Sequence, residues 1–160
     1  MRLPFVWVVL SAAAVTFLSG NALACGESIF RAGKGVHYRA FTAPIPGTVL
    51  VYASTDDERA VADSLRAAGH EVHVVGTDLE LEMEVRSQPF DVIVAPFSKR
   101  AAVEASAAQV VSPPDLIPVI EKGSADLRLA KAEYDDVVVS DDDVRKYLKA
   151  IHHSLKSRGA

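Results

Sequence analysis

Residues 88–97 read Gln-Pro-Phe-Asp-Val-Ile-Val-Ala-Pro-Phe, and this stretch decides the fold. Pro89 ends the element before it, residues 92–95 form an unbroken apolar run, and Pro96 stops that run because proline cannot donate to a sheet ladder. A run that is apolar on both alternating faces predicts a strand covered on both sides. Since strand and helix patterns flank this segment, we expect it to be the central strand of a parallel sheet.

Working outward from this strand, the chain alternates strand and helix patterns from residue 48 onward. Helices are predicted after the capping residues Thr55 and Thr77, at 99–110 and 124–131, and after Ser140. Five β/α units in this order predict an α/β fold with a five-stranded parallel sheet, doubly wound, in the flavodoxin-like strand order 2-1-3-4-5. The predicted strands are 49–53, 72–75, 92–95, 116–120 and 137–139.

The segment 77–86 permits two interpretations. Its apolar residues alternate strictly with glutamates, as in a half-exposed strand. Thr77 and Glu80, however, have the spacing of a capping box, and Leu, Glu and Met favour a helix over a strand. The sequence therefore predicts a helix whose alternating apolar residues are Leu79, Leu81, Met83 and Val85.

Residues 1–24 have the pattern of a secretion signal peptide. Arg2 supplies the positive end, residues 5–18 form an apolar run, and the Ala-Leu-Ala at 22–24 is a small-x-small cleavage signal. A transmembrane anchor is the alternative, but the run is shorter than the ~20 residues of a membrane span and no charged stop-transfer flank follows. We expect a periplasmic mature chain that begins at Cys25 and has no transmembrane segment.

Cys25 stands where a bacterial lipoprotein carries its lipidated cysteine, but the same cleavage signal also suits a soluble exported protein. Both outcomes remain open, and a single cysteine cannot form an internal disulfide. Arg2 is the only charged residue of 1–24, so the mature chain has 136 residues with 16 basic and 21 acidic side chains, a net charge of −5. This length suits one domain, and the negative charge disfavours nucleic acid as a partner.

The segment 25–47 is expected to form an N-terminal arm ahead of a main domain at 48–160. Strand-like pieces at 28–31 and 36–41 flank the Gly-Lys-Gly at 33–35 and predict a hairpin. The arm combines aromatic and basic side chains, a composition that is enriched in binding hot spots. We expect it either to cover the main domain or to dock a protein partner through Phe30, Arg31, Lys34, Tyr38, Arg39 and Phe41.

Four segments match a known family in their residue types and in their spacing. They are the strand at 48–53, Ala-Gly-His-Glu-Val at 68–72, Gln-Pro-Phe-Asp-Val-Ile-Val at 88–94 and Ile-Pro-Val-Ile at 117–120. Together they resemble the receiver domains of two-component response regulators over roughly residues 47–156. The resemblance implies the receiver fold.

The chemistry of receivers does not carry over to this sequence. The acidic pair that binds Mg²⁺ in receivers corresponds to Ala53 and Ser54, and the phosphate-accepting aspartate corresponds to Pro96. The switch hydroxyl falls near Gly123 and the lysine near Ser140. Without these carboxylates there is no site for a hard cation and no acyl phosphate to form, so the resemblance implies a pseudo-receiver. Asp56 and Asp57, in the helix that follows, could replace the Mg²⁺-binding pair. Acidic residues are also expected in a first helical turn, because they cap the helix and interact favourably with its dipole.

Ligands of open α/β sheets bind outside the carboxyl ends of the strands, which places any chemistry near residues 95–100. Ser98 and Lys99 suggest a nucleophile with a base, but neighbouring side chains point apart and no Gly-x-Ser-x-Gly elbow is present. The start of the following helix could instead hold an anion. The residues expected at such a rim site are Ser54, Ser98, Lys99 and Arg100.

These patterns lead to one expected function and one alternative. We expect an exported, non-catalytic pseudo-receiver domain, without metal or other cofactor, that binds another protein of the bacterial cell envelope. The alternative is a periplasmic protein that binds a small molecule or an anion at the strand rim. A rim filled by side chains favours the first function, and an open pocket that gathers the four rim residues favours the second.

Overall fold

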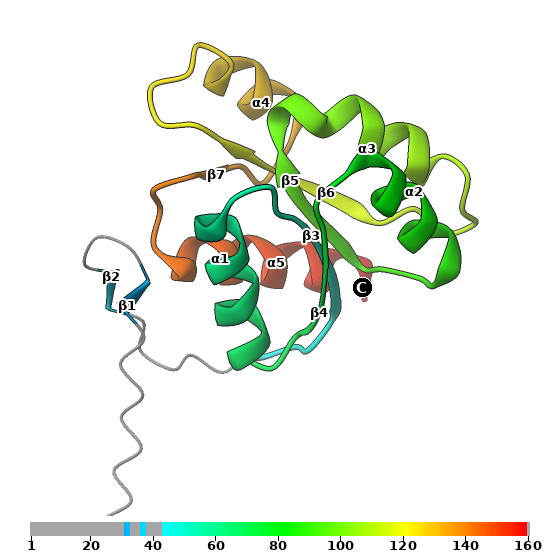
Figure 1. The fold of residues 1–160 in the computed structure, drawn as a ribbon, viewed down its shortest axis with the longest axis horizontal. Helices are drawn as coiled ribbons and strands as arrows, with labels where there is room; N and C mark the ends of the chain where they lie inside the picture. Colours follow the sequence, from blue (N-terminus) through cyan, green and yellow to red (C-terminus); the bar gives the residue numbers. More distant parts are fainter. Residues whose placement is uncertain (1–30, 33–35, 38–42, 160) are drawn as a thin grey trace, which may run out of the picture.

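The structure, a computed structural model, describes residues 31–32, 36–37 and 43–159. Its main sheet has five parallel strands in the spatial order β4-β3-β5-β6-β7, which is the order 2-1-3-4-5 along the domain (Figure 1). The predicted sheet, its parallel pairing and its strand order are therefore confirmed. The strands are β3 Thr48–Tyr52, β4 Glu71–Val75, β5 Val92–Pro96, β6 Asp115–Ile120 and β7 Val138–Val139.

Helices cover both faces of this sheet, as the doubly wound fold requires. Buried residues of α1 and α5 pack on one face, and those of α2 and α3 pack on the other (Figure 1). A short fourth helix, α4, packs through Ala130 against Phe97 and Ile120. The helices are α1 Asp56–Ala67, α2 Asp78–Ser87, α3 Arg100–Ala107, preceded by the 3₁₀ turn η1 Phe97–Lys99, α4 Leu127–Glu133 and α5 Val144–Arg158.

The central strand β5 is covered on both of its faces. Val92 and Val94 belong to the cluster under α1 and α5, whereas Ile93 and Ala95 belong to the cluster under α2 and α3. All four are at most 2% exposed. β5 pairs with β3 on one side and with β6 on the other. This confirms the interpretation of residues 88–97.

Both predicted capping boxes form. The Thr55 side chain accepts from the Glu58 N–H, and the Thr77 side chain accepts from the Glu80 N–H, with the glutamates bonding back to the cap. The ambiguous segment is therefore a helix, α2. Because a helix turns by about 100° per residue, its alternating apolar residues separate into a buried pair, Leu81 and Val85, and an exposed pair, Leu79 and Met83.

The predicted start of the last helix was wrong. Asp143, not Ser140, caps α5, and its side chain accepts from the Arg145 N–H. Ser140 directly follows β7 and donates its N–H to the Ile120 carbonyl, which extends the pairing of the strands. Asp142 in turn accepts from the Val139 N–H, so the second of the three acids holds the strand and the third caps the helix.

Of the arm, the structure describes only two short strands, β1 Arg31–Ala32 and β2 Val36–His37, which pair antiparallel. Residues 1–30, which contain the predicted signal peptide and Cys25, lie outside the described residues. Among the residues that are described, none of the helices has the length and apolar character that a bilayer span requires.

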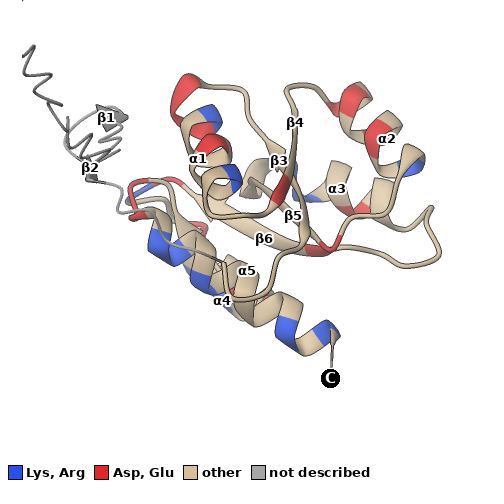
Figure 2. Cartoon of the chain, turned by 90° about the horizontal axis from the view of Figure 1, so that it is seen from below, with Lys and Arg blue, Asp and Glu red and all other residues tan. Residues whose placement is uncertain are grey.

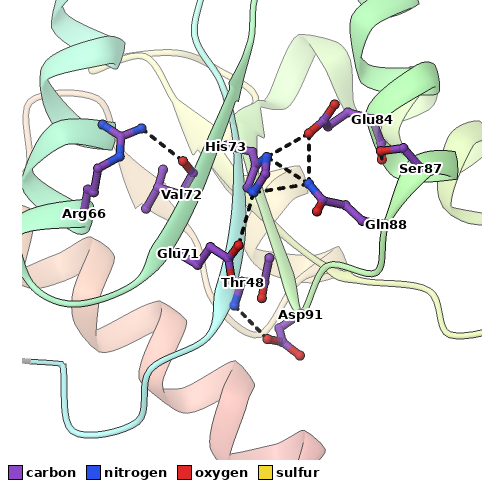
Figure 3. Close-up of polar contacts among 9 residues, drawn as sticks. All are labelled: Thr48, Arg66, Glu71, Val72, His73, Glu84, Ser87, Gln88 and Asp91. Atoms are coloured by element: carbon purple, nitrogen blue, oxygen red, sulfur yellow. Dashed lines mark hydrogen bonds and ion pairs between the residues drawn. The ribbon is translucent and has the colours of Figure 1, made fainter.

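The amino ends of three strands are tied together at Gly47. Its N–H donates to Nδ1 of the buried His70, and its carbonyl accepts from the Glu71 N–H. The Asp91 carboxylate accepts from the Thr48 N–H at 2.8 Å (Figure 3). A Cβ at position 47 would lie 2.7 Å from a methyl carbon of Leu155, so a larger residue here would force the Leu155 side chain to shift.

The double burial of β5 predicts a large effect of Val94→Asp. A carboxyl group placed in this cluster without a partner should cost several kcal/mol, out of the roughly 5–15 kcal/mol that stabilises a domain. Urea unfolding followed by circular dichroism measures the loss. Glu82→Ala, which removes only a surface ion pair with Arg86 one turn along α2, is the control and should change the free energy of unfolding by no more than about 0.5 kcal/mol. Equal stability of Val94→Asp and wild type would contradict the placement of β5.

Burial of His70 predicts a stability that depends on pH. Burial lowers the pKa of His70, and its Nδ1 already accepts a hydrogen bond, so the folded protein holds the neutral ring. The unfolded chain takes up this proton at its ordinary pKa of about 6.5. Stability is therefore complete above that pH and declines as the pH falls through and below it, until the lowered folded pKa is reached.

The free energy of unfolding, measured by urea titration between neutral and mildly acidic pH, tests this dependence. His70→Asn should reduce the slope of that free energy against pH, whatever its effect on absolute stability. Lys131→Gln, a substitution at an exposed position of α4, should leave the slope unchanged. A slope that is the same in His70→Asn and wild type would show that another group causes the dependence.

Candidate functional site

The carboxyl ends of β3 and β5 form the rim where a doubly wound sheet places its ligands. Three of the four predicted rim residues follow β5, with Ser98 and Lys99 in η1 and Arg100 at the start of α3. Ser54 follows β3, two residues beyond its end at Tyr52. The rim therefore contains the predicted residues, but their side chains do not line a common pocket, as the contacts below show.

Lys99 is part of a closed network with Tyr52 and Asp78. The Tyr52 hydroxyl and the Lys99 ammonium both donate to Oδ1 of Asp78, each at 2.8 Å. The ammonium also lies 5.2 Å from the centre of the Tyr52 ring, within reach of a cation–π contact. Asp78 is the first residue of α2, so the network joins the ends of β3 and β5 to the helix between β4 and β5.

The charges of this network are mutually satisfied. Hydrogen bonds from Lys99 and Tyr52 lower the pKa of Asp78, and the bond to Asp78 raises the pKa of Lys99. Burial raises the pKa of Tyr52, which is 3% exposed. The three groups are therefore held as a carboxylate, an ammonium and a neutral phenol. Lys99 in this state is a poor base for Ser98, because its proton is stabilised.

Arg100 is also engaged within the chain. Its guanidinium carbon lies 4.4 Å from the centre of the Phe97 ring, a distance typical of a cation–π contact. Phe97 is buried and makes an edge contact with Tyr134, so this ring is fixed in the third core cluster. Arg100 thus leans toward α4 and does not join Lys99.

The helix starts near the rim already hold carboxylates. At α1, Oε2 of Glu58 accepts from the N–H groups of Ser54 and Thr55, at 2.6 and 2.8 Å. At α2, Oε2 of Glu80 accepts from Gly76 and Thr77 in the same way. Backbone N–H groups at a helix start are the usual anion site of such a fold. At α1 and α2 the chain's own glutamates cover the helix start. The start of α3, where the sequence predicts the anion site, has no such side-chain cap.

A small hollow remains beside the ends of β3 and β5, with a volume of about 20 Å³. This is room for about one water molecule. Its walls come from the sheet, α1 and α5, and none of the four predicted rim residues contributes to them. The lining residues are Val51, Tyr52, Glu58, Val61, Val94, Pro96, Val119 and Tyr147.

The positions that would carry receiver chemistry are occupied by unsuitable side chains. Ala53 is 1% exposed and Pro96 is the last residue of β5, so neither places a carboxylate at the rim. Asp56 lies in the first turn of α1 and pairs with Arg59 on the solvent side, with 99% of its side chain exposed. Among the described residues, no group of three or more His, Cys, Asp and Glu side chains could hold a metal ion.

The arm residues Phe30, Lys34, Tyr38, Arg39 and Phe41 lie outside the described residues, as does Cys25. Arg31 is the first residue of β1, but its side chain is not described. The prediction that this arm docks a partner therefore stays a prediction.

Sequence analysis missed a second polar cluster, between β4 and the end of α2. Nδ1 of His73 lies 2.8 Å from Glu84 Oε1 and 2.9 Å from the Gln88 side-chain nitrogen, which in turn donates to Glu84 (Figure 3). The imidazole also contacts the Phe90 ring edge-on. This cluster fastens the carboxyl end of α2 to the edge strand. The spacing of Glu84 and Gln88, one helical turn apart, was the available signal.

A larger hollow lies at the end of α2, on the side of the sheet opposite to the rim. Its volume is about 320 Å³, and its walls come from residues 85–90 and from residues 110–112 with Pro114. Val111, on its border, is fully exposed. Arg86 spans the two walls by donating to the Gln109 side chain. Of the two hollows described among residues 43–159, the larger one thus lies at the carboxyl end of α2, away from the rim.

Comparison of the chain with family models, with curated proteins and with solved structures gives no match. The assignment to the doubly wound, flavodoxin-like α/β fold therefore rests on the parallel sheet in the order 2-1-3-4-5 and on the helices that cover both of its faces.

Proposed function

We propose that this chain is an exported, non-catalytic pseudo-receiver domain that binds another protein of the bacterial cell envelope. The observation that carries the proposal is the filled rim. Tyr52, Asp78 and Lys99 satisfy one another there, and the chain's own glutamates cover the starts of α1 and α2. A small-molecule or anion site at the rim would need cations or N–H groups that are free. The pairing of Lys99 and the capping of α1 and α2 therefore argue against the alternative function, whereas the start of α3 has no side-chain cap.

The outer face of α2 is the surface that we propose for the partner. Leu79 and Met83 are one helical turn apart, and 67% and 64% of these residues are exposed. Large apolar side chains that lie next to each other in solvent are a feature of protein-binding surfaces, and methionine adapts well to a partner's shape. The hollow at the carboxyl end of the same helix is bordered by Val111, a third exposed apolar residue.

The secretory location of this function is supported by residues 1–24, whose pattern is that of a signal peptide. Whether the protein is then soluble or anchored through Cys25 does not change the proposed contact surface, because α2 lies far from that residue in the sequence.

The non-catalytic part of the proposal predicts that the purified protein will not take up phosphate. With Mg²⁺ and acetyl phosphate, or with beryllofluoride, intact-mass measurement and NMR should show no covalent or stable adduct, because Pro96 offers no oxygen nucleophile. The residual carboxylates to check are Asp56 and Asp57. A phosphorylated species that maps to either residue would contradict the loss of receiver chemistry.

The binding part of the proposal predicts where a partner can be captured. A photo-reactive phenylalanine analogue placed at Met83 should crosslink to one specific envelope protein in intact cells. The same analogue at Ser98 should give little of this product, because Ser98 lies in η1 and not on the outer face of α2. A third probe at Phe41 asks whether the N-terminal arm contacts the same partner.

Leu79→Ser is the matched test of specificity. Since Leu79 is exposed, the substitution should leave the melting temperature nearly unchanged while reducing the Met83 crosslink severalfold. Crosslinking from Ser98 alone would favour the rim as the binding site. An absence of products from all three probes would argue against a protein-binding function.

A further inference from the structure

The last helix, α5, carries charge of one sign only. Its residues, Val144–Arg158, include five basic side chains and no Asp or Glu. The segment 56–87, which contains α1 and α2, has nine acidic and three basic residues. Figure 2 shows this separation, with blue segments along α5 and mainly red segments on α1 and α2. The mature chain is acidic overall, so α5 is a local exception.

The basic residues of α5 fall into two groups. The arginines are held by the chain itself, because Arg145 pairs with Asp143 at 2.7 Å and Arg158 pairs with Asp115 at 3.1 Å. Within residues 43–159, by contrast, Lys146, Lys149 and Lys156 make no ion pair or hydrogen bond through their side chains. Asp136, between α4 and β7, pairs with His153 of α5. The charges of these three lysines are therefore not compensated within the fold.

The three lysines lie on one side of the helix. Their spacing of three and then seven residues places them within an arc of about 80° over a length of about 15 Å. All three are exposed, whereas the opposite side of α5 is buried in the core. We call Lys146, Lys149 and Lys156 the lysine stripe.

We propose that the lysine stripe docks an acidic segment of a protein partner. The inference rests on the proposed protein-binding function and adds the chemistry of the partner. An extended segment of about five residues has the length of the stripe, at roughly 3.3 Å per residue, so two or three of its carboxylates could face the three ammonium groups. Lysine is a flexible, hydrated point charge, which suits such a contact and speeds encounter with an oppositely charged surface.

An anionic membrane fits the stripe less well than an acidic polypeptide. Helices that lie on membranes insert large apolar side chains, and among the described residues the exposed large apolar side chains are all outside α5. The net charge of −5 also opposes the approach of the whole domain to an extended anionic surface. A peptide segment needs only local contact with the stripe, which lies on the exposed side of α5.

The test compares two triple variants of the full chain. The stripe variant is Lys146→Gln, Lys149→Gln and Lys156→Gln. The control is Lys122→Gln, Arg128→Gln and Lys131→Gln, which loses the same charge at exposed positions outside α5. The probe is a fluorescent acidic peptide of alternating Glu and Ser, followed by anisotropy at low and physiological salt. Vesicles of phosphatidylglycerol and phosphatidylcholine are the second probe.

We expect the peptide to bind the wild type at low salt and to perturb NMR amide signals of α5. The affinity of the stripe variant for the peptide should fall by about tenfold or more, and that of the control should stay within about twofold of wild type. The loss is limited because each exposed contact contributes a modest, screened energy. No binding by the wild type, or equal weakening in both variants, would overturn the inference. Vesicle binding that depends on the stripe, without peptide binding, would replace the acidic partner by a membrane.

The crosslink from Met83 separates this inference from the proposed function. If the stripe variant still gives that crosslink while the wild type fails to bind the peptide, only the inference about the stripe is lost. If the wild type binds the peptide through α5 but gives no crosslink, the proposed α2 contact is lost and the stripe stands alone.

Discussion

The exclusion of water from both faces of β5 is the constraint on which the rest of the structure depends. Val92 and Val94 on one face and Ile93 and Ala95 on the other need separate apolar layers, so no single helix layer can satisfy the strand. A strand of this kind is stable only in the middle of a sheet, between two neighbours and under two helix layers. The doubly wound order follows, because right-handed β-α-β connections deliver helices to both faces.

The same constraint determines where chemistry could occur. It brings the carboxyl ends of β3 and β5 side by side and directs Tyr52 and Lys99 to one place, where Asp78 joins them from α2. In this chain the polar groups that meet there form hydrogen bonds and an ion pair with one another. A carboxylate between an ammonium and a phenol, with glutamates on the adjacent helix starts, is a stable arrangement that leaves little for a ligand to gain.

Local patterns in the sequence were sufficient to predict the elements and their order, because hydrophobic period and capping spacing are local properties. The α2 segment shows their relative weight, since the box formed by Thr77 and Glu80 prevailed over a strict strand-like alternation. Ser140 shows their limit. Three acids follow it, and only the pairing of β7 with β6, which is not local, determines that Asp143 caps α5. The rim network was missed for the same reason, as Tyr52 and Asp78 are 26 residues apart.

The fold places the fewest constraints on residue type at the outer faces of the helices. A buried residue such as Leu81 or Ile151 is explained by the core, but nothing in the core requires Leu79 to be apolar or Lys149 to be basic. Exposed apolar side chains reduce solubility, and uncompensated lysines on one helix face repel one another. Features that packing does not require and that have such costs are best explained by contacts outside the chain. In a domain with a filled rim, those outer faces are therefore where recognition is to be sought.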